Sequence, residues 1–101
     1  MDWNSLSNIQ ILLEVGKRVK EIRLQKRLTQ REVAERAGVS LFTMTQIEKG
    51  KSVSLSMLIP VLRVLKLLNN LEQLFPEQEL SPVEVMRLKG KAPQRIKLSK
   101  K

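Results

Sequence analysis

The side chains of this sequence that can take part in binding or chemistry are bases, acids and amides, because it contains no Cys and no His. Without these two residue types the chain has no disulfide, no zinc site built on thiolates or imidazoles, and no His-based acid or base. We therefore predict that it is not an enzyme and that it has no catalytic residue, metal site or cofactor. What remains is recognition by charge and hydrogen bonding.

The positive charge is unevenly distributed. The formal net charge is +9, and the surplus lies in residues 14–51, with ten bases and five acids, and in residues 87–101, with seven bases and no acid. Such basic blocks are typical of a protein that binds a polyanion, most often nucleic acid, although a basic surface can also serve solubility alone. The aromatic residues, Trp3, Phe42 and Phe75, are too few for single-strand binding by base stacking.

The sequence contains no membrane signal. No apolar run approaches the roughly 18 residues that cross a bilayer, and residues 1–8 do not resemble a signal peptide. We expect a cytoplasmic protein with no membrane partner, and the absence of Cys fits a reducing compartment.

Helix caps and helix breakers predict an all-α protein. The first helix is expected to begin after Ser5 and to end near Arg27, with an apolar face made of Leu6, Ile9, Leu13, Val19 and Ile22. Gly16 lies on the same face, where it costs about 1 kcal/mol relative to Ala. It predicts that two helices meet there or that another backbone comes close.

The next two helices have clear boundaries in the sequence. Thr29 and Glu32 form a predicted capping box at the start of the second helix, and Gly38 ends it. Ser40 is the predicted N-cap of the third helix, which ends at Gly50.

Two further helices are predicted less sharply. The fourth starts after Ser54 or Ser56, and Pro60 predicts that it is kinked or begins late. A short fifth helix is expected to start at residues 69–70 and to stop at Pro76.

The sixth helix has the most complete start signal. Ser81 is its predicted N-cap, Pro82 takes the first helical position and Glu84 completes a capping box. Leu80 and Val85 are placed to form a hydrophobic staple across this start, and Gly90 is expected to end the helix.

The stretch from Gln30 to Lys49 fits a helix-turn-helix, in which two short helices pack through small and apolar residues across a tight turn. Ala34 is small where the helices would cross, and Gly38 supplies the positive φ of the turn. The positions with the required residue types are Val33, Ala34, Ala37, Gly38, Val39, Met44 and Ile47.

In these residues the sequence resembles the Cro and lambda repressor-like (XRE) helix-turn-helix family. The resemblance rests on GKRVKEIRLQKRLTQREVAERAGVS, on TQIEKGK and on the apolar helix that follows. It implies a compact five-helix DNA-binding domain whose third helix lies in the major groove, and a homodimer that binds a palindromic operator. The domain would span residues 13–75, after an N-terminal helical extension at 1–12. A short C-terminal helix at 76–90 and a basic flexible tail at 91–101 would follow.

The resemblance also implies roles for individual residues. Arg23 and Glu48 match the family's ion pair between helices 1 and 3, with a phosphate contact as the alternative for Arg23. Gln30 matches the start of helix 2, where the family contacts a phosphate and supports helix 3. Arg31 stands beside it on an exposed face and is a second expected DNA contact.

The outward side of the third helix is the expected DNA-binding surface. The Gln46 amide can bond adenine N6 and N7, Thr45 can reach a phosphate or base edge, and Lys49 meets the DNA backbone. Thr43, between the two faces of the helix, is an expected phosphate contact. The full set of expected contacts in this region is Ser40, Leu41, Phe42, Thr43, Thr45, Gln46 and Lys49.

Leu41 and Phe42 depart from the family pattern, which more often has polar residues there. Apolar side chains at the start of this helix can contact thymine methyl groups. Alternatively, Phe42 folds back onto the domain or joins a protein contact.

The segment SPVEVMRLKGKAPQR resembles the C-terminal extension of HipB-type antitoxins, which are repressors encoded beside HipA-like kinase toxins. This resemblance implies an autorepressor that also binds a HipA-like toxin or an accessory subunit. The alternative is a helix that only extends the dimer, followed by a nonspecific tail. In that tail, Lys91, Arg95 and Lys97 can neutralise DNA phosphates, or residues 95–98 can add a strand to a partner's sheet.

The leading prediction is therefore a sequence-specific repressor that binds double-stranded DNA, with antitoxin as its biological role. A stand-alone or phage-type repressor would share its chemistry. A bridging adaptor would use the same fold for protein contacts instead.

Overall fold

The computed structural model describes residues 1–78 and 81–91, and every regular element in these residues is helical. One compact unit comprises Met1–Leu68, and a second unit begins at Asn69, earlier than the end of the predicted domain at residue 75. The first unit contains the 3-10 helix η1 (Trp3–Ser5), α1 (Asn8–Gln25), α2 (Gln30–Ala37), α3 (Leu41–Glu48) and α4 (Leu55–Val64). The short helix η2 (Leu68–Asn70) spans the boundary, and α5 (Leu71–Leu74) and α6 (Pro82–Lys91) follow. The prediction of an all-α fold is confirmed.

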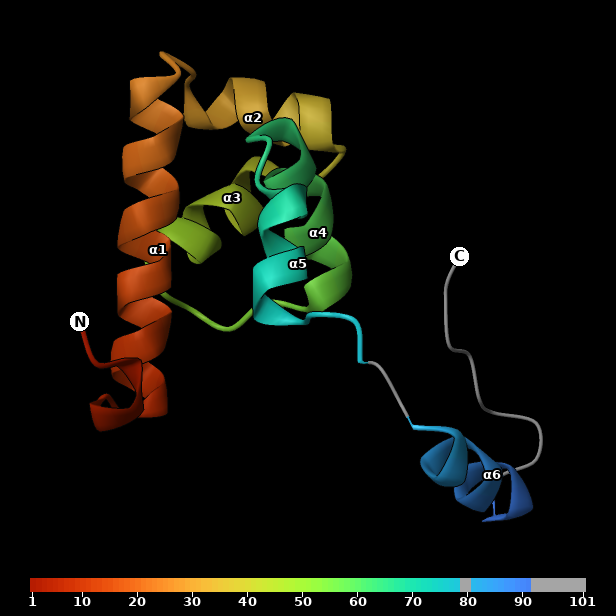
Figure 1. Ribbon diagram of the computed structural model, residues 1–101. Coiled ribbons are helices and arrows are strands. Elements are labelled where there is room, and N and C mark those ends of the chain that lie inside the picture. The colour runs from red at the N-terminus through yellow and green to blue at the C-terminus, as the bar shows by residue number, and fades with distance from the viewer. Residues whose placement is uncertain (79–80, 92–101) are drawn as a thin grey trace. The chain divides into compact units, whose positions relative to one another are not determined.

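The core of the first unit forms around α3, which contacts α1, α2 and α4 (Figure 1). The buried hydrophobic residues are Val19, Val33, Ala34, Met44, Ile47, Val61 and Leu65. Ala37 and Val39 are partly buried and pack against this core, and Gly38 has a φ of 73°. All the positions that predict a helix-turn-helix therefore have the burial or backbone conformation that the motif requires.

Local hydrogen bonds start α2 and α3 where the sequence predicts. Thr29 Oγ1 accepts a hydrogen bond from the Glu32 N–H at 3.0 Å, and the Thr29 N–H donates to Glu32 Oε1 at 2.8 Å. The Thr29 backbone N–H lowers the pKa of the Glu32 carboxyl, because the bond stabilises its charged form. At α3, the Thr43 N–H donates to Ser40 Oγ at 2.9 Å.

The start of α1 differs from the prediction. Ser7, not Ser5, is the N-cap, and Ser7 and Gln10 form the capping box. Ser5 is the last residue of η1, in which the ring of Trp3 lies 4.7 Å from Cζ of Arg18. This cation–π contact packs η1 against α1. The Ser7–Gln10 capping box starts the regular helix two residues later than predicted.

Only part of the predicted apolar face of α1 enters the core. Val19 is buried and Ile22 packs against the core, whereas Ile9 and Leu13 are 71% and 53% exposed. The N-terminal turns of α1 extend beyond α3, the helix that covers the rest of this face (Figure 1).

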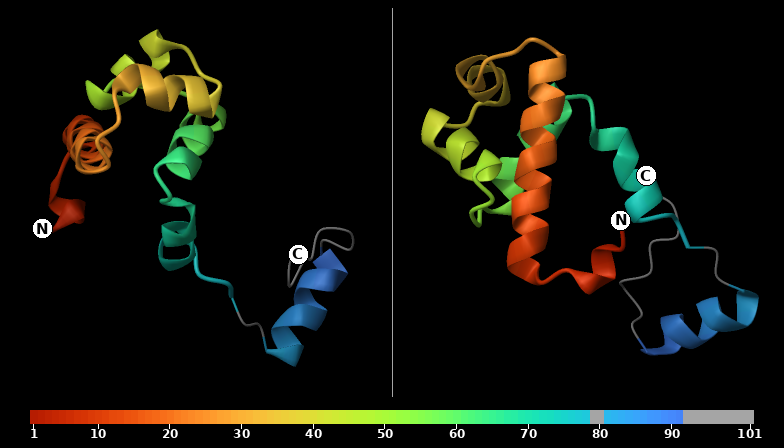
Figure 2. Two further views of the ribbon diagram at one scale, coloured as in Figure 1. Left: turned by 90° about the horizontal axis from the view of Figure 1, so that it is seen from above. Right: turned by 90° about the vertical axis from the view of Figure 1, so that its left-hand side faces the viewer.

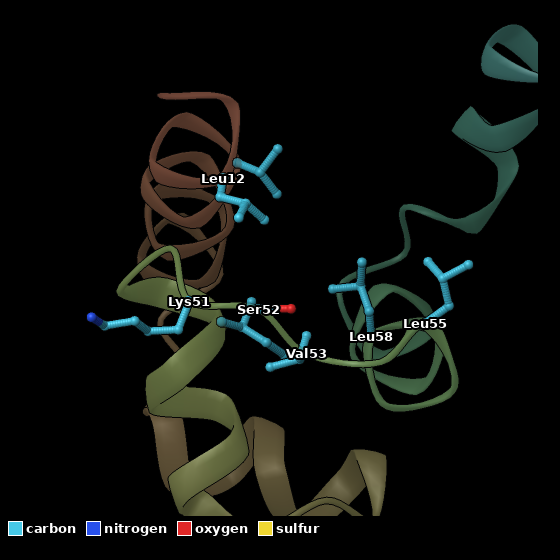
Figure 3. A pocket seen from close by; sticks show the side chains of 8 residues that line it. Leu12, Lys51, Ser52, Val53, Leu55 and Leu58 are labelled. Carbon is cyan, nitrogen blue, oxygen red and sulfur yellow. The ribbon is translucent and has the colours of Figure 1, made fainter. Parts of the chain in front are cut away.

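An apolar pocket of about 180 Å³ lies in the first unit between α1, α4 and the loop that joins α3 to α4 (Figure 3). Its lining comprises Leu12, Val15, Ile47, Lys51, Ser52, Val53, Leu55 and Leu58. The Lys51 side chain points away from the hollow (Figure 3). Because Ile47 belongs to the buried side of α3, the pocket is on the core side of that helix.

The start of α4 also differs from part of the prediction. The helix begins directly after Ser54 and contains Pro60, so the late start does not occur. Ser54 makes no side-chain capping bond, and its hydroxyl lies 3.0 Å from that of Ser56 instead. Asn70 precedes α5, as predicted, but it too makes no side-chain capping bond.

The predicted start of α6 is confirmed. The Glu84 N–H donates to Ser81 Oγ at 3.1 Å, and the Ser81 N–H donates to Glu84 Oε1 at 3.1 Å. The helix ends at Lys91, one residue beyond the predicted end at Gly90. The staple residue Leu80 lies outside the described residues. No helix of the described part is long and apolar enough to span a membrane.

Gly16 marks a close approach of two backbones. Helix α1 continues through this residue without interruption (Figure 2). A Cβ atom added to Gly16 would lie 2.5 Å from the Ile47 carbonyl oxygen and 2.8 Å from that of Glu48. Of the two explanations that the sequence leaves open, the close approach is therefore correct, and it involves the C-terminal end of α3.

This contact predicts that Gly16→Ala destabilises the fold. Inside a helix, Ala is normally favoured over Gly by about 1 kcal/mol. Here the methyl group would push against backbone atoms that cannot rotate away, and the free energy of unfolding should fall by about 1 to 3 kcal/mol. Denaturant unfolding followed by circular dichroism measures the difference.

Gly38→Ala is the matched control. A Cβ at Gly38 meets nothing within 4 Å, so only its φ of 73° is costly, at about 1 to 2 kcal/mol. Gly16→Val should lower the free energy of unfolding more than Gly16→Ala does. Gly38→Asn should be more stable than Gly38→Ala. A Gly16→Ala protein as stable as the wild type would contradict the steric argument.

Candidate nucleic-acid interface

A buried ion pair connects α1 to the C-terminal end of α3. Arg23 Nε donates to Glu48 Oε2 at 2.6 Å, and Nη2 donates to Oε1 at 3.0 Å, so the pair is bidentate. The side chains of Arg23 and Glu48 are only 8% and 3% exposed. Arg23 Nη1 also donates to the Leu28 carbonyl oxygen at 2.8 Å, which ties the α1–α2 loop to the same guanidinium. Each charge is thus compensated at a site that is almost closed to water.

The pair extends through Gln30 to the outward side of α3. Gln30 Nε2 donates to Glu48 Oε1 at 2.9 Å, and the Thr45 hydroxyl lies 3.4 Å from Gln30 Oε1. Gln30 is the first residue of α2, so one amide connects the starting turn of α2 to two turns of α3. This is the supporting contact to helix 3 that the family resemblance implies for Gln30.

The outward residues of α3 form one stripe. Phe42, Thr45, Gln46 and Lys49 are spaced by three, one and three residues, which places them on one side of a helix. We call these four residues the outer stripe. Phe42 and Lys49 are exposed, and Thr45 and Gln46 are half-buried. The opposite side of α3 carries the buried residues Met44 and Ile47.

The other residues predicted to contact DNA lie around this stripe. Ser40 and Leu41 are exposed at the start of α3, and Thr43 is half-buried there. The Ser40 hydroxyl donates to Thr43 Oγ1 at 3.0 Å, which links these two expected contacts. Arg31 is exposed on the first turn of α2. Of the predicted tail contacts, Arg95 and Lys97 lie outside the described residues, as does the side chain of Lys91.

Two contacts of the site have no signal in the sequence. The bond from Arg23 to the Leu28 carbonyl depends on the path of the α1–α2 loop, in which Arg27 has a φ of 59°. The link from Thr45 to Gln30 depends on the angle between α2 and α3. A cap or an apolar pattern can be recognised locally, whereas both of these contacts exist only after the helices have packed.

The described residues, 1–78 and 81–91, contain no cluster of acidic side chains that could hold a metal ion. The candidate site is a surface of hydroxyls, amides, bases, the aliphatic side chain of Leu41 and one aromatic ring. Such a surface can form hydrogen bonds and ion pairs with a partner.

The fold and the paired helices α2 and α3 define this part of the chain as a helix-turn-helix domain. Residues 19–67 match a family model described as helix-turn-helix, of the XRE type. The match begins in α1 and ends after α4, so it contains the whole motif and the buried ion pair. It indicates a DNA-binding domain of the kind found in transcription regulators. No curated protein matches the chain.

The geometry predicts that Arg23→Ala acts mainly through stability. Removing the guanidinium leaves the Glu48 carboxylate buried without its partner, at a cost of roughly 3 to 5 kcal/mol in the free energy of unfolding. Unfolding by denaturant measures this cost, and Arg23→Lys, which keeps the charge but loses the bidentate geometry, should fall in between.

The double variant Arg23→Ala/Glu48→Ala provides the control. It removes both charges, so it should be more stable than the sum of the two single variants predicts. If Arg23→Ala instead unfolds like the wild type but loses DNA affinity, Arg23 contacts a phosphate, and the prediction that it acts mainly through stability is wrong.

Proposed function

We propose that this protein is a sequence-specific transcriptional repressor that binds double-stranded DNA as a homodimer in the cytoplasm. The observation that carries the proposal is the outer stripe of α3, which presents Gln46 and Lys49 outward while a buried ion pair fixes the helix from behind. In a helix-turn-helix the second helix enters the major groove, where an outward amide can bond an adenine.

The surroundings of the stripe support a DNA partner. Residues 14–51, which include α2 and α3, carry ten bases and five acids. Gln30, Arg31, Ser40, Thr43 and Lys49 provide amide, guanidinium, hydroxyl and ammonium groups that can bond phosphate oxygens. Phosphate contacts would set the position of the protein on the duplex, and the stripe would select the bases.

A finer proposal concerns the biological role. The C-terminal segment resembles the extension of HipB-type antitoxins, and α6 within it has Val83 and Met86 exposed, which offers apolar surface to a partner. We propose on this basis an antitoxin that represses its own operon and binds a HipA-like toxin or accessory subunit. A kinase-like reading frame beside the gene would favour this role, and its absence would favour a stand-alone or phage-type repressor.

Selection of duplexes from a random library by the full chain tests the function. The selected sequences should be palindromic, with half-sites about one helical turn apart, because two recognition helices related by a two-fold axis enter successive major grooves. Sedimentation of the protein, free and on a selected duplex, should give two chains per duplex. A protein that stays monomeric in both states, or that enriches no sequence, would contradict the proposal and favour a bridging adaptor.

Gln46→Ala and Lys49→Ala should have separable effects on DNA binding. Gln46→Ala removes a base contact, so it should relax the preference at one position per half-site and cost about 1 to 3 kcal/mol per contact. Lys49→Ala removes a phosphate contact, so it should weaken all sequences alike and reduce the slope of log affinity on log salt by about one.

Repeated selection and salt titration with both variants distinguish these effects. Glu35→Ala, on the exposed side of α2, is a control that changes a charge without touching the stripe. An unchanged preferred sequence with Gln46→Ala would show that the base-contacting surface is elsewhere.

A further inference from the structure

Phe42 is an exposed aromatic residue on a surface that is otherwise mostly polar. It lies in the first turn of α3 and is 71% exposed, and its neighbour Leu41 is 37% exposed. This exposure contradicts the alternative in which Phe42 folds back onto its own domain. The ring is therefore free to contact a partner of this surface.

The backbone under Phe42 is held in place. The Thr43 N–H donates to Ser40 Oγ at 2.9 Å, and the Ser40 hydroxyl donates to Thr43 Oγ1 at 3.0 Å. These bonds close the first turn of α3 around Leu41 and Phe42. The ring is thus presented from an ordered turn and not from a loop, which favours a contact of defined geometry.

The surroundings of the ring favour a polar partner over an apolar protein surface. The stripe continues from Phe42 through Thr45, Gln46 and Lys49, none of which is apolar. Leu41 is the only exposed apolar residue beside Phe42 on this helix. Large continuous apolar patches mark sites of contact with other proteins, whereas the exposed apolar residues of α3 are Leu41 and Phe42. An isolated ring among amides and bases fits a partner that is mostly polar and anionic and that offers one small apolar group.

Duplex DNA offers such a group in the major groove. The base edges there consist of hydrogen-bond donors and acceptors, except for the C5-methyl group of thymine. The methyl group of 5-methylcytosine occupies the same carbon of the ring and faces the same groove. Phe42 has no hydrogen-bonding atom on its side chain, so the methyl group is the part of a base edge that it can favour.

We propose that Phe42 recognises the C5-methyl group of a pyrimidine in the major groove, and that it thereby sets one position of the DNA sequence. This inference rests on the proposed function and extends it from the hydrogen-bonding residues to an apolar contact. Contact between ring and methyl removes apolar surface of both from water, and burial of one methyl-sized group corresponds to about a three- to fivefold change in affinity.

The test uses the full chain and a duplex that it has selected. Each thymine is replaced in turn by deoxyuridine, which keeps every hydrogen-bonding atom and lacks only the methyl group. Wild-type affinity should fall about three- to fivefold at one thymine per half-site. Phe42→Ala should bind the original duplex more weakly and should show no further loss at that thymine. Gln46→Ala is the matched control, because it should bind more weakly yet keep the sensitivity to the methyl group.

A second pair of duplexes separates the two sources of the methyl group. The sensitive base pair is replaced by a cytosine pair with or without the C5-methyl. Tighter binding to the methylated duplex, lost in Phe42→Ala, would assign recognition of either methylated pyrimidine. Equal binding to both, with the deoxyuridine effect retained, would assign thymine alone. Either outcome supports the proposal.

Several results would overturn it. Deoxyuridine could have no effect at any position, or an equal effect in the wild type and in Phe42→Ala. If Phe42→Ala dissociates the dimer and the methyl group has no effect, the ring is in a protein contact. A chain that selects no duplex at all overturns both this inference and the proposed function, whereas selection without methyl sensitivity overturns only this inference.

Thermal unfolding of Phe42→Ala and Phe42→Leu checks that both variants fold, as the exposure of the ring predicts. Phe42→Leu should retain part of the sensitivity to the methyl group.

Discussion

The carboxylate of Glu48 is buried at the C-terminal end of α3, and the position of α3 depends on the groups that compensate its charge. A buried carboxylate without a partner costs several kcal/mol, so packings that bring Arg23 to Glu48 are favoured over those that leave it unpaired. The same guanidinium also binds the Leu28 carbonyl, and Gln30 binds the same carboxylate. One ionic cluster thereby fixes the end of α1, the loop after it, the start of α2 and the end of α3.

This cluster acts together with Gly16, which lets the backbone of α1 come against the carbonyls of Ile47 and Glu48. Helices of eight residues such as α2 and α3 are too short to be stable alone, so they owe their stability to such tertiary contacts. All the contacts lie on the inner side of α3 and at its C-terminal end. None of these contacts uses the outer stripe. Thr45 is the exception in the stripe, since its hydroxyl also lies near Gln30.

Helix ends with a local signal could be predicted from the sequence, whereas those that depend on tertiary contacts could not. The capping boxes at Thr29 and Ser81 and the αL glycine at Gly38 were predictable, because each depends on residues within one turn of chain. The inward positions of α2 and α3 were predictable from residue size. Ser7 was predictable in the same way, from its capping box with Gln10, and the prediction of Ser5 overlooked that signal. The contact of the Trp3 ring with Arg18, more than a dozen residues away, has no local signal.

The candidate site follows the same division. The residues of α3 that point outward follow from helical spacing, so the stripe could be predicted from the sequence alone. The exposure of Phe42 could not be predicted, because an aromatic ring at a helix start can turn back onto its own domain, and only the packed fold decides.

Gln30 has both a structural role and a proposed role in binding. One of its amide N–H groups is used on Glu48, and the other remains available for the proposed phosphate contact. A phosphate held there would pull on the same side chain that supports α3. The proposed backbone contact and the orientation of the proposed base-contacting stripe would therefore be coupled through one amide.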